Sequence, residues 1–359
     1  MVPPVRDAKD PTMLSWFKKA GPTQADINGQ AITVQPKETL LQAALRAGID
    51  FPHSCRVGGC ASCKCKLVSG QVKALTEAAY ILSDEELDAG MILACQAVPK
   101  GDVRIEVDLA RAAARRTVGG RVVAQERLTH DIVRLRVQLD EALPYQGGQF
   151  AELSIDSLPG VARSYSFANA PQPDAQVSFF VRKVPGGVFS GHVHATDLMG
   201  QRVQVQGPAG DFHLRAADAP VWLAAGGSGL APIMALLQAL EATGSLRPVT
   251  LLFGARTQAD LYLQDELAAY AARWPAPFAV HTVLSHEPET SGWSGPRGLL
   301  HTHAAPHWVP GAHAYLCGPP PMVDAMAEAL RELGAPAAHI HADRFTTLHD
   351  GVQPVTRAA

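Results

Sequence analysis

The sequence contains no apolar run of the roughly 20 residues that a membrane-spanning helix needs. It also has no excess of one charge, because 31 Lys and Arg residues nearly balance 34 Asp and Glu residues, for a formal net charge of −3. Proteins dedicated to nucleic-acid binding normally carry a basic face. We therefore expect neither a membrane span nor a nucleic-acid partner.

Cysteine is scarce, with six residues in 359, and this argues against a secreted fold built on disulfides. Residues 1–20 hold only a short apolar patch between Met13 and Phe17, too short for the apolar region of a secretion signal. These observations predict a cytoplasmic protein with reduced thiols. The length, with 47% hydrophobic and 18% charged residues, is typical of two or three globular domains.

Four of the six cysteines form one pattern. Cys55, Cys60 and Cys63 make a C-x4-C-x2-C run, and Cys95 follows at a distance. This spacing matches plant-type [2Fe–2S] sites, in which three thiolates come from one loop and the fourth from a distant segment. Two glycines inside the run let the backbone curl close to a cluster. A zinc site is an alternative, but zinc sites usually show two short ligand pairs, and Cys95 has no such neighbour.

The sequence in and beside this run also holds a further cysteine and three basic residues. Cys65 falls in an expected strand, and we interpret it as a small buried residue rather than a fifth ligand. Arg56, Lys64 and Lys66 place positive charge next to the run. These charges suit an acidic docking face on a partner protein, and plain solvation is the alternative.

Residues 22–107 carry the signals of a small mixed sheet with helices packed on it. The expected elements are a hairpin over residues 26–34 that turns at Asn28-Gly29, a helix over 39–47 that ends at Gly48, a short helix after a Ser83–Glu86 capping box, and a strand that carries Cys95. We expect an α+β domain that holds the cluster near one edge.

A strand-rich stretch follows over residues 121–216, after an expected linker at 108–120 that closes at Gly119-Gly120. Six segments rich in β-branched residues are separated by Gly and Pro clusters: residues 121–128, 131–139, 149–155, 163–169, 177–184 and 202–205. Six such strands predict a closed antiparallel β-barrel.

Strands and helices alternate over residues 217–345. The expected strands are 221–225, 249–253, 278–284, 313–316 and 339–341, and the expected helices are 230–242, 263–273 and 321–333. This alternation predicts a doubly wound parallel sheet. Residues 346–359 are then a C-terminal tail.

A glycine loop, Gly226-Gly227-Ser228-Gly229, directly follows the first strand of this sheet and opens a helix. Such a turn lets the backbone approach a pyrophosphate, whose charge the helix N-terminus favours. A plain tight turn is the alternative, because a lone glycine loop is a weak signal. Pro232 stands where a dinucleotide-binding fingerprint would have its third glycine.

Cys317-Gly318-Pro319 ends the fourth strand of the same sheet. Ligands of open α/β sheets bind beyond the carboxyl ends of strands, so Cys317 and Gly318 suit the reactive ring of a nicotinamide. From the residues alone, a small pair that makes a turn before a helix fits equally well.

Two motifs belong to the strand-rich stretch. Arg163-x-Tyr165-Ser166 lies on one strand, and Gly187-x-x-Ser190 begins a helix-like segment. An Arg suits a phosphate, a Tyr ring suits a planar cofactor face, and a Ser hydroxyl can bond a flavin nitrogen. Singly each motif is ordinary strand composition, and only the combination is informative.

With all these motifs in one order, residues 22–345 resemble the NADH-dependent reductase components of bacterial oxygenases. These belong to the ferredoxin–NAD(P) reductase superfamily and carry an N-terminal plant-type ferredoxin domain; the benzoate dioxygenase and phenol hydroxylase reductases are examples. The resemblance implies a multidomain chain: a ferredoxin-like (β-grasp) [2Fe–2S] domain over 22–107, an antiparallel six-stranded FAD-binding β-barrel over 121–216 and an NAD(P)-binding α/β domain over 217–345.

The resemblance also implies which residues act. The cluster ligands would be Cys55, Cys60, Cys63 and Cys95. The FAD-binding residues would be Arg163, Tyr165, Ser166, Gly187 and Ser190. The residues for the nicotinamide nucleotide would be Gly227, Gly229, Pro232, Cys317, Gly318 and Pro319. Asp343-Arg344-Phe345 resembles the acidic-x-aromatic segment of the family, so Phe345 would cover the flavin.

Two of these residues are the implied catalytic candidates. Ser166 would lie near the reactive N5 of the flavin, and Cys317 would line the nicotinamide position. The dinucleotide is expected to be NADH, because Gly254-Ala-Arg256 with Asp260 resembles NADH-using relatives. Arg256 also suits a 2′-phosphate, so NADPH stays open.

The expected function uses the nicotinamide nucleotide, the flavin and the cluster in turn. Nicotinamide gives up electrons as a hydride, whereas a cluster accepts them singly, so a flavin is needed between them. We expect an oxidoreductase that passes electrons from NADH through FAD and [2Fe–2S] to a terminal oxygenase with a Rieske or di-iron centre. A reductase for a desaturase, a cytochrome P450 or a deoxysugar pathway is one alternative, and a non-catalytic electron-carrier subunit is another. The pairs His192/His194 and His301/His303 lack a third ligand at metal spacing, so no metal is expected there.

Overall fold

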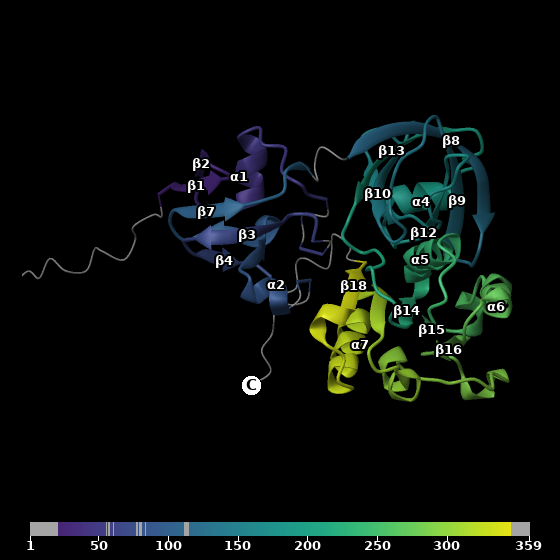
Figure 1. Ribbon diagram of the computed structural model, residues 1–359. Helices are drawn as coiled ribbons and strands as arrows, with labels where there is room; N and C mark the ends of the chain where they lie inside the picture. Colours follow the sequence, from purple (N-terminus) through teal and green to yellow (C-terminus); the bar gives the residue numbers. More distant parts are fainter. Residues whose placement is uncertain are drawn as a thin grey trace, which may run out of the picture.

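The computed structural model describes residues 21–54, 56, 58–59, 61–76, 78, 81–82, 84–110 and 115–345. They form three sheet-based units in chain order, coloured purple to blue, teal, and green to yellow in Figure 1. A small mixed sheet, an antiparallel six-stranded sheet and a parallel sheet are the three architectures that the sequence predicts, and this fold class is confirmed. Among the described residues, no helix combines the length and hydropathy of a membrane span.

The first unit has a five-stranded sheet in the order β2-β1-β7-β3-β5 and a separate β4–β6 pair. Its elements are β1 (Thr23–Ile27), β2 (Gln30–Val34), α1 (Leu40–Arg46), β3 (Lys64–Ser69), β4 (Val72–Ala74), α2 (Asp84–Asp88), β5 (Met91–Leu93), the 3-10 turn η2 (Ala94–Gln96), β6 (Ala97–Pro99) and β7 (Val103–Glu106). Asn28 and Gly29 have φ angles of 53° and 88°, as a two-residue hairpin turn requires. The Thr39 side chain caps α1 by accepting the Gln42 N–H at 3.2 Å.

One local expectation in this unit is wrong. Cys95 does not lie in a strand but on η2, between β5 and β6. The turn directs the backbone N–H of Cys95 toward the sulfur of Cys63, which a continuous strand paired with its neighbours would not do. The helix α2 follows Ser83 as expected, but Ser83, and with it the predicted capping box, lies outside the described residues.

The second unit is a six-stranded antiparallel sheet in the order β11-β10-β13-β8-β9-β12. Its elements are β8 (Arg116–Arg127), β9 (Ile132–Leu139), β10 (Phe150–Ile155), β11 (Ala162–Ser166), β12 (Gln176–Arg182), α4 (Val188–Ala195) and β13 (Arg202–Ala209). An antiparallel bridge between Phe167 and Phe179 connects the two edge strands, so the sheet curls into a barrel. Phe189 and Val193 of α4 belong to the hydrophobic cluster of its interior.

The expected linker ends too late in the sequence. Gly119 and Gly120 lie inside β8, which begins at Arg116 and pairs Gly120 with Val203 of β13. A Cβ on Gly120 would come within 2.8 Å of the Gln138 carbonyl oxygen and of a Val137 methyl group. The glycine pair therefore permits close strand contact and does not mark a flexible connection.

The third unit is a parallel sheet in the order β16-β15-β14-β17-β18. Its elements are β14 (Val221–Gly226), the 3-10 turn η3 (Gly227–Gly229), α5 (Leu230–Ala242), β15 (Val249–Ala255), the 3-10 turn η4 (Gln258–Asp260), α6 (Gln264–Arg273), β16 (Phe278–Leu284), β17 (His313–Gly318), α7 (Pro320–Glu332), the 3-10 turn η8 (Ala337–His339) and β18 (Ile340–Arg344). Every residue of β14 is buried, because helices and the barrel cover both faces of the sheet.

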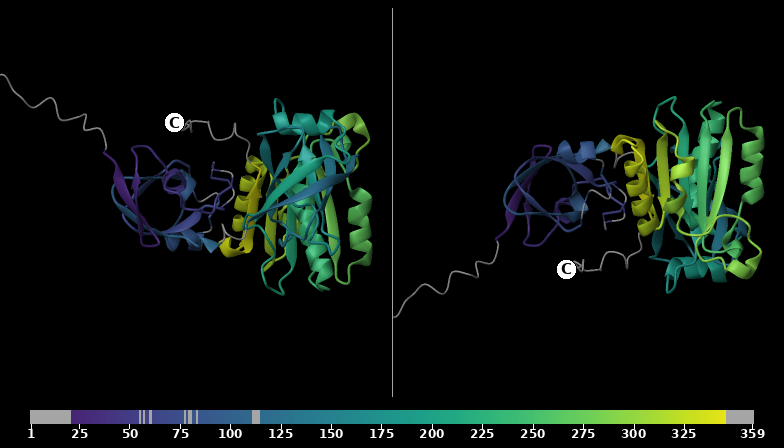
Figure 2. Two further views of the ribbon diagram at one scale, coloured as in Figure 1. Left: turned by 90° about the horizontal axis from the view of Figure 1, so that it is seen from above. Right: turned by 90° about the horizontal axis from the view of Figure 1, so that it is seen from below.

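Hydrophobic clusters show how the units are joined. One cluster contains Phe180 and Phe212 of the second unit together with Leu223 and Phe253 of the third. The first unit has a cluster of its own, built from residues between Ala25 and Val107. Both views of Figure 2 show α7 on the side of the parallel sheet that faces the first unit.

Candidate cofactor sites

Two of the four expected cluster ligands, Cys63 and Cys95, are described, and both are buried. The backbone N–H of Cys95 points at the Cys63 sulfur, with 3.5 Å between nitrogen and sulfur. The side-chain amide of Gln96 donates to the Cys95 sulfur over 3.6 Å. Hydrogen bonds to the sulfurs are a means by which proteins tune iron–sulfur centres, so these residues fit the cluster.

The other two expected ligands, Cys55 and Cys60, lie outside the described residues. Between them, Gly58 has a φ of 81°, and a Cβ at this position would come within 2.8 Å of the Gln96 side chain. The Gln96 side chain also donates to the Arg56 carbonyl oxygen at 3.3 Å. The cysteine run thus packs against the segment that carries Cys95.

Cys65 is only 1% exposed and faces the core of the first unit. Burial, and to a lesser degree the nearby Cys95, raises the pKa of the Cys65 thiol to about 12. A small thiol enclosed by apolar side chains behaves as a core residue. This supports the interpretation of Cys65 as a buried structural residue.

The three basic residues beside the run do not share one environment. Arg56 and Lys66 are exposed, as docking to a partner would require. The Lys64 side chain is only 12% exposed and forms ion pairs with Glu86 and, at 3.4 Å, with Asp211. The docking hypothesis is therefore wrong for Lys64, because this ammonium group is engaged within the chain.

The expected FAD residues of the first motif lie together on β11. Ser166 is buried at the end of the strand, and the Arg163 side chain is exposed. The Tyr165 ring lies 5.4 Å, centroid to centroid, from the ring of Phe189 on α4. This contact brings β11 beside the start of α4. Burial raises the pKa of Tyr165, so the phenol stays neutral.

Gly187 and Ser190 shape the start of α4. Gly187 is the N-cap, and a Cβ there would come within 2.6 Å of the Ser190 hydroxyl oxygen. That oxygen accepts the backbone N–H of Val184 at 3.0 Å, which closes the loop before the helix. The first N–H groups of a helix have no intrahelical acceptor and favour an anion, so this arrangement fits a pyrophosphate.

The glycine loop of the third unit packs directly against the Cys317-Gly318 segment. β14 and β17 are parallel neighbours, so both segments lie at the same edge of the sheet. A Cβ on Gly229 would collide with the Cys317 carbonyl oxygen, and one on Gly318 would come within 3.0 Å of the Gly226 carbonyl oxygen. Two motifs far apart in the sequence therefore form one backbone-lined site that fits a nucleotide. Pro232 is buried in the first turn of α5.

Cys317 is fully buried below this site, with its sulfur 4.0 Å from a carboxylate oxygen of Asp343. Burial, and secondarily Asp343, raises the pKa of the Cys317 thiol, so the thiol stays protonated and is not a nucleophile. The backbone N–H of Phe345 donates to the Gly318 carbonyl oxygen at 2.9 Å. Phe345 therefore lies beside the residues expected to line the nicotinamide position.

Tyr262 and Arg182 are two residues at this site that motif analysis missed. The buried Tyr262 hydroxyl donates to the Gly227 carbonyl oxygen at 2.8 Å, which holds the glycine loop in place. Arg182 of β12 brings a guanidinium nitrogen to 3.6 Å from where a Cβ on Gly227 would lie. Neither belongs to a motif, and only the tertiary fold brings them to the loop.

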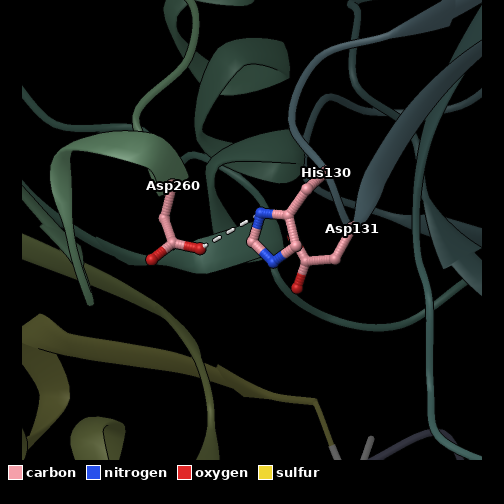
Figure 3. Close-up of side chains that lie close together, drawn as sticks. All are labelled: His130, Asp131 and Asp260. Atoms are coloured by element: carbon pink, nitrogen blue, oxygen red, sulfur yellow. Dashed lines mark ion pairs between the residues drawn. The ribbon is translucent and has the colours of Figure 1, made fainter.

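His130, Asp131 and Asp260 point toward one another where the barrel meets the parallel sheet (Figure 3). Their potential ligand atoms all lie within 4.8 Å of one another, which would suit a metal ion. However, Asp131 accepts a hydrogen bond from Arg182 at 3.0 Å. Arg256 pairs with Asp260 at 3.2 Å and with Asp131 at 3.6 Å. Because two guanidinium groups neutralise the two carboxylates, we interpret this group as an ion-pair network.

Three of the four histidines singled out in the sequence make local hydrogen bonds. His192 bonds the Ser157 hydroxyl at 2.8 Å, and His194 bonds the Val181 carbonyl oxygen at 3.0 Å. His303 bonds the Arg297 carbonyl oxygen at 3.0 Å. The expectation that these pairs hold no metal stays a prediction.

Comparison with known proteins agrees with this geometry. Residues 25–100 match the 2Fe-2S iron-sulfur cluster binding domain, residues 120–214 the oxidoreductase FAD-binding domain and residues 223–328 the oxidoreductase NAD-binding domain. The chain is 43% identical to the xylene/toluene monooxygenase electron transfer component of Pseudomonas putida, over 86% of this chain and 89% of that protein. It is 35% identical to the phenol 2-monooxygenase reductase component of Pseudomonas sp. strain CF600, over 92% and 96%.

Solved structures show the same similarity. The cytochrome P450 reductase of Amycolatopsis has a TM-score of 0.67 and 33% identity, with 90% of this chain and 99% of that chain covered. The ferredoxin reductase in carbazole 1,9a-dioxygenase has a TM-score of 0.66 and 30% identity, with 90% and 98% covered. The chain therefore belongs to the family of oxidoreductases that join a [2Fe–2S], an FAD-binding and an NAD-binding domain as reductase components.

When bound, FAD and a [2Fe–2S] cluster would supply the redox chemistry, which is hydride acceptance at the flavin and single-electron exchange at the iron. The role of the chain is to hold these groups and to orient them. The cysteine run and η2 would hold the iron, β11 and α4 would hold the flavin nucleotide, and the Gly229–Cys317 contact would shape the surface for the nicotinamide. Because the Cys317 and Tyr165 groups are neutral, the site provides hydrogen bonding and shape and not a charged nucleophile.

Proposed function

We propose that this protein takes a hydride from NADH onto bound FAD and delivers the electrons singly, through a [2Fe–2S] cluster, to an oxygenase that hydroxylates an aromatic compound. The observation that supports it best is the joint occurrence, in one chain, of the Cys63–Cys95 sulfur site, the FAD-binding domain and the Gly229–Cys317 nucleotide site. The relatives named after xylene/toluene and phenol monooxygenases support the class of acceptor.

Residue roles follow from the positions described above. Cys55, Cys60, Cys63 and Cys95 would ligate iron. Ser166, buried at the end of β11, would offer its hydroxyl to the flavin ring, and Arg163 would bind the flavin pyrophosphate. Arg182, beside the glycine loop, would bind a phosphate of the nicotinamide nucleotide.

The two carboxylates drawn in Figure 3, which pair with Arg256, favour NADH over NADPH. A 2′-phosphate needs a cation after the second strand, and Arg256 is the candidate there. Arg256 is instead paired with Asp260 and Asp131. Burial alone would raise the pKa of Asp131, but the hydrogen bonds from Arg182 and Thr129 outweigh it and lower the pKa, so this carboxylate is ionised at neutral pH.

A second acceptor class is supported by one specific observation. The Amycolatopsis cytochrome P450 reductase matches 90% of this chain at 33% identity. A cytochrome P450 is therefore the alternative acceptor to an iron-dependent hydroxylase.

The test starts with anaerobic titration of the purified holoprotein by NADH and by NADPH, with flavin and cluster absorbance followed separately. We expect stoichiometric bleaching of both by NADH, and at least a tenfold lower kcat/KM for NADPH. Cytochrome c, a one-electron acceptor, should then be reduced. A flavin that is not bleached by NADH would refute the proposal. Coupled product formation with a purified hydroxylase or a purified P450 would decide between the two acceptors.

A further inference from the structure

Lys64 occupies an unusual position for a lysine. It is the first residue of β3, directly after the expected ligand Cys63, and its side chain is only 12% exposed. Lysine is rarely buried to this extent unless it is paired. Its ammonium group pairs with Glu86 of α2 in its own unit and with Asp211, 147 positions further along the chain, in the second unit. The strand that follows the cluster loop is thereby tied to the barrel.

Asp211 is itself held in place from the other side. Its carboxylate pairs with Arg215 at 3.2 Å, and the same guanidinium donates to the Asp211 carbonyl oxygen at 2.9 Å. The backbone N–H of Arg215 donates to the hydroxyl of Tyr315, on β17, at 2.8 Å. A continuous series of polar contacts therefore runs from Lys64, beside the cluster site, through the end of the barrel to the nucleotide sheet.

Two further polar contacts join described residues of the cluster loop to the barrel side. A guanidinium nitrogen of Arg115 donates to the His53 carbonyl oxygen at 2.5 Å, and the hydroxyls of Ser54 and Ser164 lie 3.5 Å apart. A cavity of about 240 Å³ lies between the units. His53, Ala61 and Ser62 line it on the cluster side, and Gln149, Gly210 and Asp211 line it on the barrel side.

We propose that Lys64 is a positioning residue: its ion pair with Asp211 fixes the cluster domain against the FAD barrel and thereby sets the rate of electron transfer within the chain. This inference rests on the function proposed above. Electron transfer slows steeply with distance, so a contact that holds the cluster loop at the barrel controls the rate without touching either cofactor. An ion pair that is only partly exposed is less screened than a surface pair, yet it remains sensitive to salt.

Asp211→Asn is the primary variant, because it removes the pair from the barrel side and leaves the cluster loop unchanged. It also removes the Arg215 pair, so its effect must be matched by Lys64→Met, which leaves the Asp211–Arg215 pair in place. Asp218→Asn is its matched control, since Asp218 is exposed in the segment that follows. On the cluster side, Lys64→Met is matched by Lys66→Met on the same strand, where Lys66 is exposed. Lys64→Arg keeps the charge and should retain near wild-type behaviour.

The holoproteins are mixed anaerobically with NADH in a stopped-flow instrument, and flavin and cluster signals are followed separately. We expect Asp211→Asn and Lys64→Met to leave flavin bleaching unchanged and to slow cluster reduction by about fivefold, the scale of losing one partly exposed ion pair. High salt should slow the wild type toward the variants and leave the variants unaffected. Small-angle scattering, which is independent of turnover, should show an increased radius of gyration for Asp211→Asn and not for Asp218→Asn.

Unchanged cluster reduction together with unchanged scattering in Asp211→Asn would overturn the inference, even if Lys64→Met failed to hold its cluster. An equal effect of Asp218→Asn would also overturn it. If the function proposed above were wrong, the result would be distinguishable, because NADH would then reduce neither the flavin nor the cluster of the wild-type protein.

Discussion

The FAD barrel meets its two neighbours in different ways. Toward the parallel sheet, one hydrophobic cluster crosses the boundary and includes Phe180 of the barrel and Phe253 of the sheet. Toward the first unit, the barrel side makes polar contacts with Lys64, Ser54 and the His53 carbonyl oxygen, and the first unit has a separate hydrophobic cluster. Helix α2 of the first unit also lies against η8 of the third unit.

This difference has a functional consequence. Apolar burial contributes roughly 25 cal/mol per Å² and excludes water over a whole surface, so the two nucleotide sites share one rigid core. Individual polar pairs contribute about 1 kcal/mol or less when exposed and weaken with salt. The geometry for hydride transfer is therefore built into a core, whereas the polar contacts between the cluster domain and the barrel are directional and can be removed one at a time by single substitutions.

The largest expected effect is the loss of stability when the apolar contact between the barrel and the parallel sheet is disrupted. Phe180 is 4% exposed and lies edge-on to the Tyr262 ring at 5.7 Å. Phe180→Ala should lower the free energy of unfolding by about 3–5 kcal/mol, because it removes apolar contacts and leaves a cavity in the shared cluster. Denaturant unfolding followed by flavin fluorescence measures this. Leu246→Ala, at a side chain that is 72% exposed, is the control and should change stability by less than about 0.5 kcal/mol.

Gly229→Ala should damage the nucleotide site with little damage to the barrel. The added Cβ collides with the Cys317 carbonyl oxygen, so one of the two loops must move. We expect kcat/KM for NADH to fall by about 10- to 100-fold, because misplacing the nicotinamide by a fraction of an ångström weakens hydride transfer. FAD content and dithionite reduction of the cluster should be normal. A variant with full NADH activity would contradict the backbone-lined site.

Acid should destabilise the parallel sheet through His341. Burial, with help from Arg215 and His313, lowers the pKa of His341 to about 3 in the folded protein, below the unfolded value of about 6.5. Between these values only the unfolded chain binds the proton, so stability falls as pH decreases from about 6.5. The slope should approach about 1.4 kcal/mol per pH unit from this residue. Chemical unfolding at pH 7, 6 and 5 measures it, and His341→Gln should flatten the slope; an equal slope in both proteins would refute the assignment.

The smallest effect is expected for Tyr262→Phe. The substitution keeps the ring but removes the hydroxyl that donates to the Gly227 carbonyl oxygen. A lost buried hydrogen bond costs about 1–2 kcal/mol, part of which should appear as a several-fold higher KM for NADH. The rate of flavin bleaching at saturating NADH should change little. If the KM stayed at the wild-type value, the loop would not depend on this contact.

Local patterns predicted much of the fold. The Asn28-Gly29 turn, the helix expected from residue 39 and the alternation of strands and helices in the parallel sheet each depend on neighbouring residues, and the structure contains them. Cys95 was misplaced because its turn depends on a contact with Cys63. Gly119 was misread as a linker because its strand partner lies far along the chain.

The residues of the candidate sites likewise fall into those with a local sequence signal and those without one. Motif spacing identified the cysteines, the glycine loop and the Cys317-Gly318 segment, because each of them forms a short run in the sequence. The partners Tyr262 and Asp211 carry no local signal, since an isolated Tyr or Asp in a loop is ordinary. Their roles follow only from which chain segments the fold brings together.

The central claim is that one polypeptide carries electrons from the nucleotide site to the cluster. Its most direct test is a stopped-flow series in which the holoprotein concentration is varied at saturating NADH under anaerobic conditions. We predict that cluster reduction follows flavin bleaching with a rate constant that does not change with protein concentration. A rate that rises in proportion to protein concentration would show transfer between molecules and would contradict the account.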